Sequence, residues 1–61
     1  MFKVGDKIML RDNWIKHDYQ YFQGEILEIA YHKDSSTPMV CLISFGLYPN
    51  HWFHVMALKK E

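Results

Sequence analysis

The sequence predicts a small all-β domain of five short strands, expected to form one unit over residues 1–61. Two observations support this prediction. Apolar and polar residues alternate with a period of two in several short segments, which is typical of strands that bury one face. Turn-forming residues separate these segments at short intervals, and no repeat, low-complexity tract or linker interrupts the chain.

The first predicted strand follows an entry turn at Val4-Gly5-Asp6. Ile8 and Leu10 then alternate with Lys7, Met9 and Arg11, as expected for a strand with one buried face. The polar and aromatic stretch over 14–21 has no clean period of either kind. We interpret it as a long, folded-over loop.

A second strand is predicted over 22–31, where both alternating sets of residues contain apolar side chains. Gly24 near its start indicates a bulge or a close approach of two backbones. The alternative is a helix over 23–32, but this segment lacks an N-cap and is flanked by strand-like sequence. The polar segment 33–38 that follows predicts a loop.

The apolar run over 39–45 predicts a third strand in a central position of the sheet. Residues 46–50 predict a hairpin connection, and 51–55 the strand that returns from it. Residues 56–58 are expected to form a single 3₁₀ turn that leads to a short last strand or a frayed tail at 59–61.

Three short motifs occur in a characteristic order along the chain. They are Phe2-Lys3-Val4-Gly5-Asp6-Lys7-Ile8, Phe22-Gln23-Gly24-Glu25-Ile26, and Trp52-Phe53 followed by Leu58. In this order they resemble SH3-like barrels, including Tudor-type modules. The resemblance implies a small five-stranded SH3-like barrel, in which the first loop and the second hairpin come together.

Within that fold, a local similarity to plasmid-encoded type II dihydrofolate reductase is carried by Val4-Gly5-Asp6, Gln23-Gly24-Glu25-Ile26 and Val55-Met56-Ala57-Leu58. That family is a tetramer with one active site in a central pore. Its pore motif is Val-Gln-Ile-Tyr, whereas the corresponding segment here is Asn50-His51-Trp52-Phe53. This departure removes the reason to transfer the activity.

The charge balance argues against nucleic acid as the main partner. Seven Lys and Arg oppose seven Asp and Glu, and the two signs alternate along the chain. Because non-specific nucleic-acid binding depends on neutralising phosphates, a balanced chain is poorly suited to it. A chain of this size buries only about 60% of its unfolded surface, so a homo-oligomer remains an alternative source of burial.

We expect a cytoplasmic protein. No apolar run approaches the roughly 20 residues of a membrane helix, and the start of the chain lacks the apolar segment of a secretory signal. The single cysteine, Cys41, fits a reducing compartment.

The candidate partner-binding residues lie in or near the first loop and the second hairpin. Tryptophan and tyrosine are frequent at interaction hot spots, and two aspartates give the first loop an acidic flank that suits a basic or cationic ligand. The candidates are Trp14, Tyr19, Tyr21, Tyr48, His51, Trp52, Asp12 and Asp18. The alternative is that most of these rings complete the core. Phe22 and Phe53 are predicted core residues.

No catalytic or metal-binding set is evident in the sequence, so no cofactor is expected. His51 and His54 are three residues apart, and such a spacing on a strand directs side chains to opposite faces. Cys41 lies between Val40 and Leu42, where burial raises a thiol pKa and lowers its reactivity. The carboxylates form no recognisable acid–base pair.

These observations favour a non-enzymatic module for protein–protein interaction, an adaptor or inhibitor with the profile of a phage or plasmid accessory protein. One alternative is a nucleic-acid-binding barrel that gathers its cations on one side. These cations are Lys3, Lys7, Arg11, Lys16, Lys59 and Lys60. The other alternative is a symmetric oligomer that binds a small ligand in a central cavity.

Overall fold

The computed structural model describes residues 1–11 and 21–61. Five strands and one 3₁₀ turn follow one another in this part of the chain. They are β1 (Lys7–Leu10), β2 (Gly24–Tyr31), β3 (Pro38–Ser44), β4 (His51–His54), η1 (Val55–Ala57) and β5 (Leu58–Lys60). The all-β prediction is confirmed, with strand boundaries that differ only at their ends. The helical alternative for residues 23–32 is wrong.

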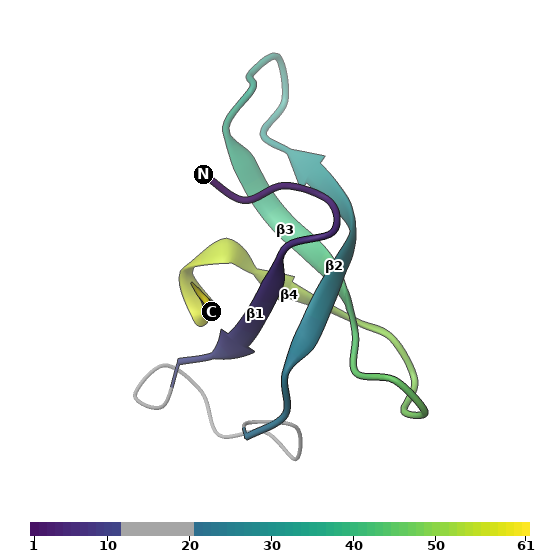
Figure 1. The fold of residues 1–61 in the computed structure, drawn as a ribbon. Helices are drawn as coiled ribbons and strands as arrows, with labels where there is room; N and C mark the ends of the chain where they lie inside the picture. Colours follow the sequence, from purple (N-terminus) through teal and green to yellow (C-terminus); the bar gives the residue numbers. More distant parts are fainter. Residues whose placement is uncertain (12–20) are drawn as a thin grey trace.

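The strands form one antiparallel sheet in the order β4-β3-β2-β1-β5. β3 lies between β2 and β4, so its predicted central position is confirmed. Figure 1 shows β2 and β3 as the long pair, with β4 crossing behind them. The β2–β3 turn is closed by the amide of His32, which donates to the carbonyl of Thr37 at 3.0 Å.

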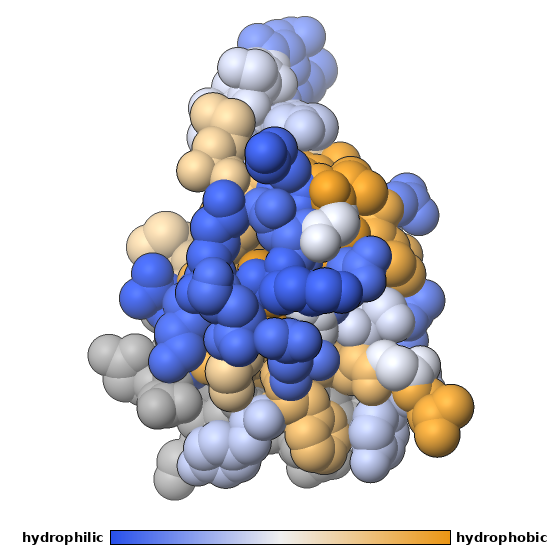
Figure 2. All heavy atoms as spheres, in the orientation of Figure 1, coloured by the Kyte–Doolittle hydropathy of each residue, from blue (hydrophilic) through white to orange (hydrophobic). Residues whose placement is uncertain are grey.

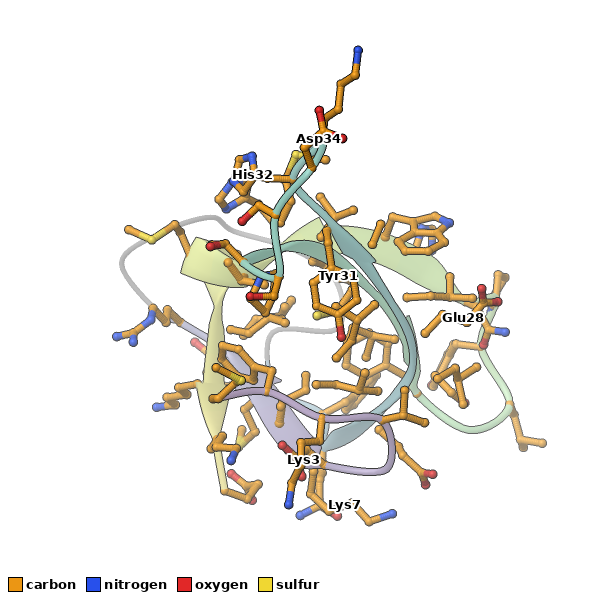
Figure 3. All side chains as sticks on the ribbon, turned by 90° about the horizontal axis from the view of Figure 1, so that it is seen from above. Lys3, Lys7, Glu28, Tyr31, His32 and Asp34 are labelled. Atoms are coloured by element: carbon orange, nitrogen blue, oxygen red, sulfur yellow. The ribbon has the colours of Figure 1, made fainter. Side chains whose placement is uncertain are left out.

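A short connection forces this sheet to curve. β4 and β5 are at opposite edges of the sheet, yet only η1 separates them in the chain. Five flat strands would place the two edge strands about 19 Å apart. Four Cα–Cα steps span at most about 15 Å. The two edges therefore bend toward each other, and Figure 3 shows the ribbon curving around a filled interior.

A bulge in β2 reverses the alternation of its side chains. Ile26 is opposite Ile43, whereas Glu28 is opposite Leu42, so Leu27 is the extra residue. Before the bulge Ile26 points inward, and after it Ile29 does, because Ile29 is opposite the buried Cys41. This change of phase explains why both alternating sets of the β2 sequence contain apolar residues.

The core is mostly aliphatic. Its fully buried side chains come from β1, β2, β3 and β5: Ile8, Leu10, Ile26, Cys41, Ile43 and Leu58. Phe45 and Phe53 complete it, with their rings in an edge-to-face contact at 6.1 Å. Among the described residues, no tryptophan or tyrosine belongs to this core.

Gly24 lies against this core with no room for a side chain. It is opposite Ile8 on β1, and a Cβ placed on it would lie 2.5 Å from Cγ2 of Ile43 and 2.9 Å from Cε1 of Phe45. The atoms that exclude a side chain at Gly24 belong to side chains and not to a second backbone, and the bulge lies further along the strand, at Leu27.

Asp6 ties the N-terminal turn to the last strand. Its Oδ2 accepts the amide of Lys3 at 2.9 Å and is 3.2 Å from Nζ of Lys60. The backbone hydrogen bond from Lys3 is the main reason why the pKa of Asp6 is lowered. Desolvation opposes it in part, and the hydrogen bond and charge of Lys60 add smaller lowering effects. The carbonyl of Asp6 also accepts the amide of Ile26 at 3.0 Å.

Gly24→Ala is expected to destabilise the fold by about 1 to 3 kcal/mol, because the added methyl overpacks the core. Urea unfolding followed by circular dichroism measures this cost. The cost should shrink in an Ile43→Ala background, which removes the atom nearest to the added methyl. An equal cost in both backgrounds would contradict the steric explanation.

Asp6→Asn is expected to weaken the dependence of stability on acidic pH. The carboxyl has a lower pKa in the folded chain than its ordinary 3.8, so its contribution to stability is complete above that value. It is lost as the pH falls through the lower, folded pKa. Urea midpoints at pH 7 and at about pH 3 should therefore differ less in the variant than in the unchanged chain.

Lys60→Gln is the control for that experiment. It keeps the backbone hydrogen bond from Lys3, which is the main cause of the shift, so most of the pH dependence should persist. Loss of the dependence in Lys60→Gln alone would show that the ion pair dominates instead.

Candidate partner-binding surface

The described candidate rings are exposed. Tyr21 is 77% exposed, Tyr48 47% and Trp52 50%, while His51 is half-buried. Trp14, Tyr19, Asp12 and Asp18 lie outside the described residues. For Tyr21, Tyr48 and Trp52, the alternative that the rings complete the core is wrong.

Strand β4 directs its aromatic residues to two faces. Phe53 is opposite the buried Cys41 and points inward, and His51 lies on the same side, 6.2 Å from the Phe53 ring. Trp52 is opposite Leu42 and points outward. The candidate residues His51 and Trp52 therefore do not share a face of the sheet.

Phe22 stacks on Tyr48. The two ring centroids are 5.2 Å apart, and the ring planes differ by 17°. This contact joins the segment before β2 to the β3–β4 hairpin. The prediction that Phe22 belongs to the core is wrong, because its side chain is 38% exposed. Phe45 and Phe53 already fill the aromatic part of the core, and Phe53 is confirmed there.

The side of β2, β3 and β4 that faces away from the core carries a second group of apolar side chains, which we call the outer sheet face. One row across the strands contains Glu28, Leu42 and Trp52, and the next contains Ala30, Val40 and His54. Leu42, Val40 and Ala30 are only half-buried. Figure 2 shows an apolar area on the right of the view, beside the course of β2 and apart from the hydrophilic side chains in the centre.

Sequence reasoning did not identify the outer sheet face. The signal for it was the run of apolar residues in β3, where both alternating sets are apolar although one of them points away from the core. Glu28 gave no signal of its own, because the bulge at Leu27 decides which way it points.

The cations near β1 and β5 lie beside carboxylates. Nζ of Lys7 is 2.8 Å from Oε1 of Glu25, and Lys60 is paired with Asp6. The Nε–H of Arg11 donates to the carbonyl of Leu58 at 3.1 Å. Of the cations in this region, Lys7 and Lys60 are therefore balanced by carboxylates within the molecule.

The described residues contain no group of three or more histidine, cysteine, aspartate or glutamate side chains placed to hold a metal ion. His54 has a local role, because its Nδ1 accepts the amide of Met56 at 3.1 Å and caps η1. Cys41 is fully buried, and this burial raises the pKa of its thiol. Cys41 is thus a core residue, as predicted.

No helix in the described part of the chain combines the length and apolar character needed to cross a bilayer. Comparison of the chain with protein-family models, with curated proteins and with solved structures found no match.

The Phe22–Tyr48 stack is expected to couple its two residues energetically. Stacked aromatic pairs contribute about 0.5 to 1.5 kcal/mol beyond area burial. A double-mutant cycle with Phe22→Leu and Tyr48→Leu, measured by urea unfolding, should give a coupling energy in that range. Additive effects of the two substitutions would show that the rings are neighbours without a stabilising contact.

Proposed function

We propose that the chain is a non-enzymatic module that binds another protein through its exposed tyrosine and tryptophan side chains. The observation that carries this proposal is the division of the aromatic residues. Aliphatic residues with Phe45 and Phe53 close the core, whereas Tyr21, Tyr48 and Trp52 remain exposed. Tyrosine and tryptophan supply large contact areas at low entropic cost, which is why they concentrate at hot spots.

We also propose that the curved sheet closes as an SH3-like barrel. Three features support this. The strand order places β1 between β2 and β5, and a 3₁₀ turn leads into β5. Because Gly24 has no side chain, β2 can pass close to the side chains of Ile43 and Phe45. The short link between the two edge strands supports closure as well, because it limits their separation.

Two observations favour a protein partner over a nucleic acid. Lys7 and Lys60, two of the cations that a nucleic-acid interface would use, already have carboxylate partners. The carboxylates that pair with these lysines would also repel the phosphate groups of a nucleic acid. Fewer phosphates would then be neutralised and fewer counterions released, which lowers the affinity.

Trp52→Ala is expected to weaken partner binding about tenfold or more, as truncation of a hot-spot tryptophan does. The immobilised chain would capture partners from an extract of the source organism. Isothermal titration calorimetry with the captured protein, once identified by mass spectrometry and purified, then gives the affinity of each variant. Tyr48→Ala tests the hairpin end of the surface in the same assay.

Val4→Ala is the matched control, because it shortens an exposed apolar side chain on the N-terminal turn. Thermal melts establish that each variant is folded. Unchanged affinity in both Trp52→Ala and Tyr48→Ala would refute the proposed surface.

A further inference from the structure

We propose that the outer sheet face is a docking site for a basic segment of another protein, with an arginine or lysine of that segment lying along Glu28, Leu42 and Trp52. This inference rests on the proposed function, since Trp52 belongs to both surfaces. It adds the chemistry of the partner and a second contact residue, Glu28, that lies far from Trp52 in sequence.

The register of the strands sets the geometry. Glu28 is opposite Leu42, and Leu42 is opposite Trp52, so the three side chains form one row across β2, β3 and β4. Adjacent strands are about 4.8 Å apart, which separates the backbones of Glu28 and Trp52 by about 10 Å. A half-buried leucine lies between an exposed carboxylate and an exposed indole.

Glu28 is available to a ligand. In the part of the chain that the structure describes, it has no ion-pair partner, whereas Glu25 is paired with Lys7 and Asp6 with Lys60. Figure 3 shows Glu28 on the outer side of the β2 ribbon, away from the enclosed interior toward which Tyr31 projects. The bulge at Leu27 is what turns Glu28 to this side.

An amphipathic cation matches this row. The aliphatic stem of arginine or lysine covers apolar surface while its charged head stays at the edge. Here the stem would lie over Leu42, and the head would reach either the carboxylate of Glu28 or the face of the Trp52 indole, which is the best aromatic partner for a cation. An exposed ion pair alone contributes little to the free energy of binding. Contacts with the Leu42 side chain and with the indole are therefore needed for measurable binding.

Other occupants fit less well. A nucleic acid would bring its phosphates toward Glu28. A second copy of this chain would present the same acidic residue, and the outer sheet face itself supplies no lysine or arginine to pair with it. In the second row, Ala30 and Val40 extend the apolar surface, and His54 accepts the amide of Met56 through its Nδ1.

The test is an NMR titration of the ¹⁵N-labelled full chain with two blocked pentapeptides. One has a central arginine flanked by leucines, and in the other citrulline replaces the arginine and removes only the charge. We expect saturating shifts at the amides of Glu28 and Leu42 and at the indole N–H of Trp52. The citrulline peptide should bind about fivefold more weakly.

Glu28→Gln should lower the affinity for the arginine peptide about threefold to fivefold and leave that for the citrulline peptide unchanged. Glu25→Gln is the matched control, because it removes a carboxylate of the same strand that is paired with Lys7, and it should affect neither peptide. Equal affinity for the two peptides, or shifts confined to Tyr21 and Tyr48, would overturn the proposal.

Shifts of the outer sheet face that depend on protein concentration, in the absence of peptide, would also overturn it, in favour of an interface between copies. Failure of this proposal is distinguishable from failure of the proposed function. Suppose that Trp52→Ala loses the captured partner, while Glu28→Gln binds both peptides with the affinity of the unchanged chain. The proposed partner-binding surface is then supported, and the proposal of a basic ligand is refuted. If Trp52→Ala retains the partner, the proposed surface itself fails.

Discussion

The three-residue connection between β4 and β5 is the constraint on which the rest of the structure depends. It joins strands at opposite edges of the sheet, so the sheet must bend around whatever fills its concave side. The filling is mostly aliphatic and is completed by the rings of Phe45 and Phe53. The missing side chain at Gly24 and the extra residue at Leu27 are the local adjustments that let β2 follow this curve while keeping its pairing with both neighbours.

The curve also places neighbouring residues in different environments. Phe53 and Trp52 are adjacent in sequence, yet one packs against Phe45 in the core and the other is half-exposed on the opposite side. The hydrophobic gain of the core therefore comes from residues that a ligand cannot reach. Apart from the Phe22–Tyr48 stack, the exposed rings contribute little to the stability of the unbound chain. On the proposed function, a partner would bury their remaining apolar area.

The strands could be predicted from the sequence because period-two alternation and turn residues are local signals, as at Ile8 and Leu10 or in the hairpin after Phe45. The position of the bulge could not, because both alternating sets of β2 contain apolar residues and the phase is set only by pairing with β3. Phe22 was assigned wrongly for a related reason. Hydrophobicity alone does not reveal that Phe45 and Phe53 already fill the aromatic part of the core.

The sequence singled out Tyr21, Tyr48 and Trp52 but left open whether these rings are exposed or complete the core. Their exposure, the separation of Trp52 from His51 and its alignment with Glu28 all depend on tertiary structure. The strand register has an evolutionary consequence along β3, where Cys41 and Ile43 face inward and Val40 and Leu42 face outward. Substitutions at the first pair would change the packing of the core. On the proposed function, substitutions at the second pair would change the contacts with a partner, so one strand of seven residues could vary those contacts and keep the fold.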